Sequence, residues 1–539
     1  MLGALAAALC AGCGGGGSSS TSQGLGRSLA TIFQDQPHIL SDPVGTLDTF
    51  RSLGVTDVRI SIGWTSLAPA PTSRTRPPGF NATSPAAYAA AQWAPYDAAV
   101  RAAAARGINV SFLLTGPAPV WAAVPAPRGT ATHNPGVYEP SATQFGDFVT
   151  AVGTRYDGHY TPPGSSSPLP AVTFWSIWDE PNYGYQLAPQ AIGTVEVSPY
   201  LYRELLDSAW AALHGTGHGA DTILIGETAP RGANVPGVAN GMVPLRFLRA
   251  LYCVDSSYRE LRGAAAAARR CPTTAAASAR FRAQNPGLFA ASGFAVHLYT
   301  PGQVGRPDLA SPANEPDYAG LADLPSLQRA LDRLRARYGV AAPLPVYNTE
   351  FGFQTNPPPS TCGCVFLSPT SAAYYLNWSE YIEWRDGRLR SDAQYLLYDA
   401  PGPPSSPSLS GFSSGLLFLN GTPKPTYAAF RLPLYLPVTS TRRGRALGVW
   451  GYVRPARYAE RDTGSVPPAE IQFRPGSRGA WRTLRTVTVT GSASAFEVPV
   501  RFSASGSVRL RWTYPKGFAD LPASAARAVT SRVQRITVR

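Results

Sequence analysis

The stretch 172–184 constrains the fold more than any other part of this chain. Residues 172–178 (VTFWSIW) form an apolar, aromatic run of strand length, and the carboxylates Asp179 and Glu180 follow it directly. Pro181 has no N–H to give to a strand ladder, so the strand ends there. Ionised groups are costly to bury without partners, and this pattern is typical of the edge of a parallel barrel where catalytic groups are placed.

A second stretch repeats the pattern. Residues 344–350 (LPVYNTE) form another short apolar strand that ends in Glu350 and is followed by Phe351 and Gly352. Glu180 and Glu350 are therefore a candidate general-acid and nucleophile pair, which glycoside hydrolysis requires. The alternative is that both are rim carboxylates in surface ion pairs, but two glutamates in the same context favour a functional pair.

The two motifs resemble those of a known group of enzymes. The sequence WDEPN at 178–182 resembles the Asn-Glu-Pro signature on strand four of clan A glycoside hydrolases, which are retaining (β/α)8 enzymes, and TEFG at 349–352 resembles their strand-seven motif. The resemblance covers roughly residues 29–434, most nearly in cellulase-like family 5 and xylosidase-like family 39. It implies that Glu180 is the acid/base and Glu350 the nucleophile, with carboxyl groups about 5–5.5 Å apart and retention of configuration.

The fold class expected for the whole chain is α/β, a (β/α)8 TIM barrel followed by a C-terminal all-β sandwich. With 539 residues the chain is too long for one ordinary domain. We expect an export leader with a Gly/Ser linker at 1–28, the barrel at 29–437 and a β-sandwich accessory domain at 438–539, where short alternating runs between Gly, Pro and Ser turns begin. The expected barrel strands are 29–33, 57–62, 109–114, 172–178, 222–227, 293–299, 344–350 and 393–398.

Three residues are expected to support the two glutamates. Arg59 alternates with Val58 and Ile60 in its strand, so it points into the barrel if they face helices. In clan A an arginine at this place supports the nucleophile. His297 and Tyr299 are two apart and share a strand face. The resemblance implies that Tyr299 hydrogen-bonds the nucleophile and that His297 contacts sugar hydroxyls or the carboxylates.

Further candidates for substrate binding or support are Trp64, Trp121, Asn182, Glu227 and Tyr398. Trp64 either floors a sugar subsite or caps the barrel. Trp121 ends a loop that resembles the strand-three loop of these families, and Asn182 completes the WDEPN motif. Glu227 is a third strand-end carboxylate that either binds substrate or pairs with an arginine. Tyr398 stands where many clan members carry a tryptophan platform.

Asp179 departs from the family pattern, which has Asn before the acid/base. An aspartate can accept a hydrogen bond from the sugar 2-hydroxyl but cannot donate one. Its charge is expected to raise the pKa of Glu180.

Other function classes find less support in the sequence. A metal-dependent barrel hydrolase would need clustered His ligands, but the six His are scattered and only His297 ends a strand, so we expect no metal and no organic cofactor. The rival to an enzyme is a catalytically silent barrel that only binds glycans. The presence of both glutamates and their supports argues against it.

The N-terminus and the cysteines indicate export. The apolar run 2–10 is too short to span a membrane and leads into a segment that resembles a bacterial lipobox with Cys13 as the lipidated residue. No Lys or Arg precedes the run, and a plain export leader is the alternative. The predicted location is extracellular or at the cell surface, with membrane contact only through a lipid anchor. Two local disulfides are expected, Cys253–Cys271 and Cys362–Cys364.

The positive charge is concentrated near the C-terminus. Of a net charge of +14, residues 441–539 carry +13, from 18 Arg and Lys against 5 Asp and Glu. This region is either an evenly solvated surface or a docking face for an anionic polysaccharide. Nucleic acid would bind such a surface without specificity, so no specific nucleic-acid partner is expected.

Overall fold

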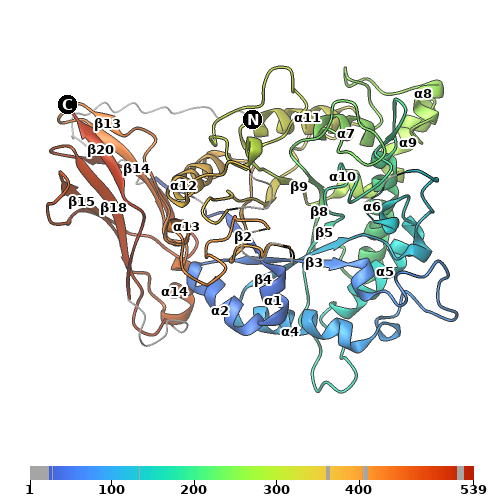
Figure 1. Ribbon diagram of the computed structural model, residues 1–539, viewed down its shortest axis with the longest axis horizontal. Coiled ribbons are helices and arrows are strands. Elements are labelled where there is room, and N and C mark those ends of the chain that lie inside the picture. Colours follow the sequence, from blue (N-terminus) through green and yellow to red (C-terminus); the bar gives the residue numbers. More distant parts are fainter. Residues whose placement is uncertain are drawn as a thin grey trace, which may run out of the picture.

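The structure is a computed structural model that describes residues 24–26, 28–130, 132, 134–359, 364–403, 405, 411–518 and 527–539. It consists of a parallel barrel wrapped by helices and a β-module that packs beside it, at the left of Figure 1. Cys13, Cys362 and the predicted leader lie outside the described residues.

The barrel contains eight parallel strands, as the sequence predicted. Their order is β10-β9-β8-β5-β4-β3-β2-β11. The barrel closes between β10 and the residues that enter β11, where Val346 N donates to Arg388 O (3.2 Å) and Arg390 N to Val346 O (2.8 Å). The strands are β2 (Ala30–Gln34), β3 (Asp57–Gly63), β4 (Asn109–Thr115), β5 (Phe174–Ile177), β8 (Thr222–Thr228), β9 (Gly293–His297), β10 (Val346–Glu350) and β11 (Ser391–Tyr395).

Helices cover the outside of the barrel and bury the apolar outer faces of its strands. Local signals set several of their ends. Ser141 and Ser368 accept hydrogen bonds from the first turns of α5 and α12, and Gly54 ends α2 with a φ of 83° that favours glycine. The helices are α1 (Gln36–Ser41), α2 (Pro43–Leu53), α3 (Trp64–Leu67), α4 (Ala90–Arg106), α5 (Ala142–Arg155), α6 (Ser198–Gly215), α7 (Pro244–Leu251), α8 (Gly263–Ala267), α9 (Ala275–Gln284), α10 (Pro286–Ala290), α11 (Leu324–Ala336), α12 (Pro369–Arg385) and α13 (Pro425–Arg431).

The module is a pair of sheets, and its helix α14 (Ala456–Thr463) packs on the barrel helix α2, where Asp462 pairs with Arg51. One sheet has the order β1-β17-β14-β12 and the other β13-β20-β18-β15-β16, with β19 paired to β18. The strands are β1 (Gly24–Gly26), β12 (Leu434–Tyr435), β13 (Ser440–Thr441), β14 (Ala446–Tyr452), β15 (Ala469–Pro475), β16 (Arg482–Val487), β17 (Ala495–Arg501), β18 (Gly506–Thr513), β19 (Ala528–Thr530) and β20 (Gln534–Val538).

The module extends beyond the boundaries expected from the sequence. Strand β1 comes from the segment expected to be a linker, and it pairs antiparallel with β17. Strand β12 lies before the expected boundary at residue 438 and pairs with β14. Pairing with a distant strand leaves no local sequence signal, so neither contribution could be predicted from these short segments alone.

A buried arginine joins the module to the barrel. Arg454, which follows β14, is 1% exposed and donates to Asp392 Oδ2 (2.6 Å) and Thr31 Oγ1 (2.5 Å), at the starts of β11 and β2. It also pairs with Glu380 of α12 and donates to Phe430 O (2.8 Å). The module therefore packs on the end of the barrel where the strands begin.

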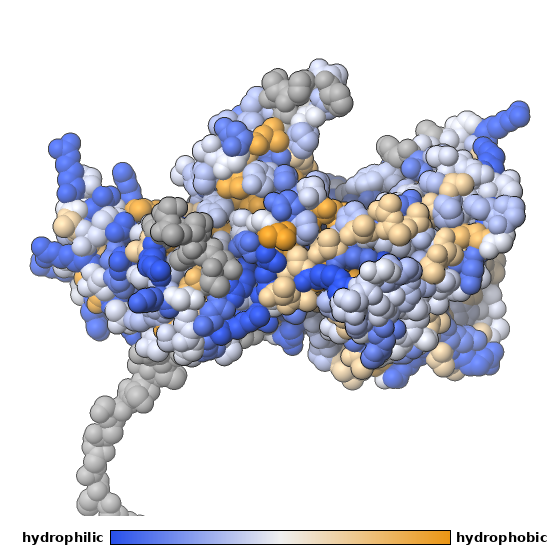
Figure 2. Space-filling view, turned by 90° about the horizontal axis from the view of Figure 1, so that it is seen from below, coloured by the Kyte–Doolittle hydropathy of each residue, from blue (hydrophilic) through white to orange (hydrophobic). Residues whose placement is uncertain are grey.

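The view from below shows the module at the left, with several strongly hydrophilic side chains projecting from it (Figure 2). Among the described residues, no helix combines the length and the apolar character needed to cross a bilayer.

Candidate active site

The two predicted glutamates lie at the edge of the barrel where the strands end. Glu350 is the last residue of β10, and Glu180 follows β5 after a turn that begins at Trp178. Trp178 and Glu180 have φ values of 62° and 36°, which non-glycine residues rarely adopt. Such backbone strain persists where the surroundings hold it, and it is often found at functional sites. Here Glu180 N donates to Glu227 O at 3.0 Å.

Arg59 is the centre of the site, and its side chain points into the barrel as predicted. Its guanidinium donates to Glu350 Oε2 (3.1 Å), Asp179 Oδ1 (3.0 Å) and Glu227 Oε2 (3.0 Å). It also donates to the Gln34 side chain. The side chain is 1% exposed, so these charge-assisted bonds act in a medium of low dielectric.

Glu227 is a buried partner of Arg59, which is one of the two roles expected for it. The register between β8 and β9 shifts at this point, and Glu227 has a φ of 46°. Bulges of this kind redirect a side chain next to an active site. Glu227 also accepts from Thr349 Oγ1 (2.7 Å) and Ser176 Oγ. It is fully buried, so it holds Arg59 in place from the barrel interior.

His297 and Tyr299 contact the two glutamates directly. Tyr299 donates its hydroxyl to Glu350 Oε1 at 3.0 Å, as the resemblance implied. His297 lies 2.9 Å from Glu180 Oε1 through Nδ1 and 2.9 Å from Glu227 Oε2 through Nε2. Both oxygens of Glu350 and one of Glu180 are thereby held in fixed positions.

The outer oxygen of Glu180 has a partner that sequence reasoning missed. Tyr185 donates its hydroxyl to Glu180 Oε2 at 2.8 Å, and its side chain is 42% exposed. It lies in the loop after the WDEPN motif, where neither periodicity nor a strand end marks it. The same loop provides Gln186, whose amide donates to Asp179 Oδ2 at 2.9 Å.

Burial and neighbouring charges shift the pKa values of the ionisable groups in the site in different directions. Burial raises the pKa of Asp179 to about 7, although Arg59 and His297 oppose this change. Burial also acts to raise the pKa of Glu227, but Arg59 and His297 outweigh it and lower this pKa to about 2. Burial acts to lower the pKa of His297, whereas Glu350, Glu180 and Glu227 raise it well above its ordinary value. At neutral pH, Glu227 is therefore anionic and His297 cationic.

Two of the other predicted residues are part of the core. Trp64 is 1% exposed and stacks on Phe148 with ring centroids 5.8 Å apart, so it offers no open face for a sugar. Asn182 is fully buried, and its amide donates to Met242 O (2.9 Å) while its Oδ1 accepts from Ala229 N (2.9 Å). Asn182 thus holds the loops after β5 and β8 together.

On β11 the residue beside Glu350 is Tyr395, not Tyr398. The strand ends at Tyr395, three residues before the predicted end. Tyr398 packs on His38, with ring centroids 4.3 Å apart. Burial raises the pKa of Tyr395, and the nearby charge of Glu350 raises it further. The alternation of β11 could have indicated Tyr395 if the strand end had been placed correctly.

Trp121 lies farther out, in the loop after β4. It is half-buried, donates its indole N–H to Pro69 O (3.1 Å), and lines a cavity of about 330 Å³ together with Arg74 and Val124. Its role in substrate binding stays a prediction.

The acidic cluster could also be considered as a metal site. Within the described part of the chain, Asp179, Glu227 and His297 offer ligand atoms that all lie within 4.8 Å of one another. The guanidinium of Arg59 lies 3.0 Å from both carboxylates and already supplies positive charge there. We therefore interpret these side chains as the partners of Arg59 and not as metal ligands.

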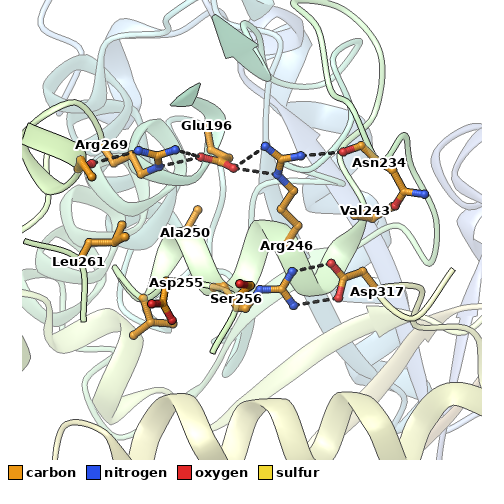
Figure 3. Close-up of a pocket in the computed structure, with 13 residues that line it drawn as sticks. Glu196, Asn234, Val243, Arg246, Ala250, Asp255, Ser256, Leu261, Arg269 and Asp317 are labelled. Atoms are coloured by element: carbon orange, nitrogen blue, oxygen red, sulfur yellow. Dashed lines mark hydrogen bonds and ion pairs between the residues drawn. The ribbon is translucent and has the colours of Figure 1, made fainter. Parts of the chain in front are cut away.

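A separate cavity of about 430 Å³ lies between α7, α8 and the hairpin of β6 (Ala191–Ile192) and β7 (Val195–Glu196). Figure 3 shows that Glu196 lies between Arg246 and Arg269, with dashed lines to both. Glu196 accepts from Arg246 (2.7 Å) and Arg269 (2.6 Å), and Arg249 pairs with Asp317. The network joins the hairpin to the insertion that the predicted disulfide Cys253–Cys271 closes, which is present. The second predicted disulfide involves Cys362, outside the described residues.

No family model matches the chain, and no curated protein matches it. Structural neighbours exist. A family 39 glycoside hydrolase from Bacteroides cellulosilyticus WH2 shares 14% identity at a TM-score of 0.45, covering 88% of this chain and 79% of its own. A glucosidase from Croceicoccus marinus shares 12% identity at a TM-score of 0.46, covering 96% and 95%. Both TM-scores are below 0.5, so the function proposed below rests on the geometry of the site.

Proposed function

We propose that this protein is a retaining glycoside hydrolase that cleaves O-glycosidic bonds of poly- or oligosaccharides by double displacement. The observation that carries the proposal is the pair Glu180 and Glu350 at the same edge of a parallel barrel. Each is partly exposed, by 13% and 16%, so each can reach a substrate. Each is also held by buried partners, which is how catalytic groups are preorganised.

In this mechanism Glu350 attacks the anomeric carbon. Arg59 and Tyr299 donate to its two oxygens and stabilise the carboxylate, which must be ionised to act as a nucleophile. Glu180 protonates the leaving oxygen, and in the second step it takes a proton from the water that hydrolyses the glycosyl-enzyme.

The carboxyl groups of the site outnumber its cations. Four carboxyl groups (Asp179, Glu180, Glu227, Glu350) surround two cations, Arg59 and His297, so two negative charges are uncompensated when every carboxyl is ionised. Within this excess of negative charge, burial raises the pKa of Asp179 to about 7. Asp179 and Glu180 are neighbours, and both face His297, at 3.9 and 2.9 Å.

The first test replaces the nucleophile. Glu350→Ala should abolish turnover of aryl glycosides, and azide should restore activity to that variant by taking the place of the carboxylate. Glu204→Ala, at an exposed glutamate of α6, is the matched control and should leave the rate unchanged. Hydrolysis by Glu350→Ala at the wild-type rate would show that the assignment is wrong.

The second test concerns the acid/base. Glu180→Ala should lose roughly 10²–10⁴-fold with poor leaving groups and little with good ones in the first step. A loss that is uniform across leaving groups would remove Glu180 from the acid role.

The alternative function, a silent glycan-binding barrel, predicts binding without turnover. A screen of aryl glycosides separates the two functions, because only a hydrolase turns them over. Adding a chelator should leave the rate unchanged, because the proposed mechanism uses no metal and no cofactor. The proposed partner is a carbohydrate, and the proposed location is extracellular or at the cell surface, where the disulfide Cys253–Cys271 would persist.

A further inference from the structure

One face of the module carries a compact group of arginines around a tryptophan. We call Arg474, Trp481, Arg509 and Arg511 the Arg–Trp platform. Arg474 lies in β15, Arg509 and Arg511 in β18, and Trp481 directly precedes β16. In both strands the platform residues are half-buried and alternate with fully buried ones, so they share the face of the sheet that points away from the module's core.

The tryptophan fixes the positions of two of the guanidiniums. Arg474 and Arg509 place theirs over the Trp481 ring, 4.8 and 4.2 Å from its centroid. Arg509 Nε also donates to Gln472 Oε1 at 2.9 Å, its directly opposite residue in β15. Cation–π contacts of this kind hold long side chains in one arrangement and so reduce the entropy lost when a ligand binds.

The charge of the platform is not compensated within the described part of the chain. Three guanidiniums face one carboxylate, Glu470, which pairs with Arg511. Neither Arg474 nor Arg509 has a carboxylate partner among the described residues, and the buried Nε of Arg474 has no hydrogen-bond partner there. Burial lowers the pKa of Arg509, and the neighbouring charges of Arg474 and Arg511 lower it further. An anion bound at this face would relieve that repulsion.

We propose that the Arg–Trp platform binds an acidic polysaccharide through its carboxylate groups. Forked guanidiniums suit the two oxygens of a carboxylate, and two of them side by side suit acidic groups carried on neighbouring sugar rings. A single-stranded nucleic acid would instead need free aromatic faces for its bases, and guanidiniums already lie over this ring. The platform would hold the substrate polymer near the barrel, and this role rests on the proposed hydrolase function. The binding of the polysaccharide itself is independent of that function.

The test measures binding of the full-length protein to polygalacturonate, a neutral glucan of similar length and a DNA duplex, in a salt series from about 0.05 to about 0.3 M NaCl. No hydrolysis is measured, so the outcome is independent of the active site. The wild type should prefer polygalacturonate, and its affinity should fall as salt rises. The double variant Arg474→Gln/Arg509→Gln should bind it roughly tenfold more weakly.

Two variants separate an organised site from net charge. Arg443→Gln/Arg445→Gln removes the same charge near β13, at the opposite edge of the sheet from β16, and should retain most of the affinity. Trp481→Leu changes no charge but releases the two guanidiniums, and should weaken binding. Equal losses in the two double variants, equal binding of neutral glucan, or a preference for DNA with the same residue dependence would each overturn the proposal. Circular dichroism of each variant checks that the module remains folded.

Discussion

Asp179→Asn tests the electrostatic description of the site through stability. The side chain accepts from Arg59 and Gln186 and is 20% exposed. Asn keeps an acceptor for Arg59, and the Gln186 amide can turn to accept from the new NH2 group. The substitution therefore removes one titrating carboxyl from the site with little change in shape.

The size of the effect follows from the pKa of Asp179, which burial raises from 3.8 to about 7. Between these pH values the folded protein keeps a proton that the unfolded chain has lost, so the wild-type free energy of unfolding falls as pH rises through this window. A difference of about 3 pKa units corresponds to at most about 4 kcal/mol. The variant lacks this loss. Its free energy of unfolding should therefore rise relative to that of the wild type from about pH 4 to about pH 7, and the difference should stay constant above about pH 8.

Urea unfolding followed by tryptophan fluorescence, at several pH values across this window, measures the difference. Asp308→Asn, at an exposed carboxylate paired with Arg306, is the control and should give a difference that does not change with pH in this way. The reasoning is refuted if the Asp179→Asn difference is constant across the window, or if the variant loses stability relative to the wild type as pH rises.

Three further predictions follow from individual contacts. Tyr185→Phe removes the hydroxyl that donates to Glu180. Because a hydrogen bond to a charged group contributes about 1.5–3 kcal/mol, the variant should lower kcat/KM by roughly tenfold or more and shift the pH–rate profile. Tyr183→Phe, at a ring whose centroid lies 5.2 Å from that of Tyr185, is the control, and equal effects of the two variants would contradict the role of Tyr185. Replacing Cys253 and Cys271 with Ser opens a loop of sequence separation 18 and should cost roughly 3 kcal/mol in the free energy of unfolding, measured in oxidising buffer; an unchanged denaturation midpoint would refute this. Arg454→Met leaves Asp392 and Glu380 buried without the guanidinium that pairs with both, and should lower the free energy of unfolding by about 3–5 kcal/mol in urea denaturation. An unchanged denaturation midpoint would argue against the ion-pair explanation.

The barrel could be predicted because its signals are local. Most of the strands are short apolar runs, and Glu180 and Glu350 stand where such runs end, so the position of both in the fold follows from the sequence. Alternation alone placed Arg59 inside the barrel, and spacing placed His297 and Tyr299 on one face.

The parts that could not be predicted depend on contacts between distant segments. Tyr185 approaches Glu180 because a loop folds back, and a loop has no periodicity to reveal this. Trp64 was equally suited to a sugar subsite and to the core until its contact with Phe148 placed it in the core. Tyr398 was misplaced because the end of β11 could not be located within three residues.

The packing of the module on the barrel also bears on the candidate site, through the middle of β10. Arg454 pairs with Glu380 in α12, and Glu383 of the same helix accepts from Asn348 Nδ2 at 2.6 Å. Asn348 lies two residues before Glu350, and its carbonyl accepts from Ser391 of β11 at 2.7 Å. The strand that carries the proposed nucleophile is therefore held at its middle residue by groups that the module helps to position, while Glu350 at its end stays partly exposed. Damage at Arg454 should accordingly reduce stability first, and activity only through the fraction of protein that remains folded.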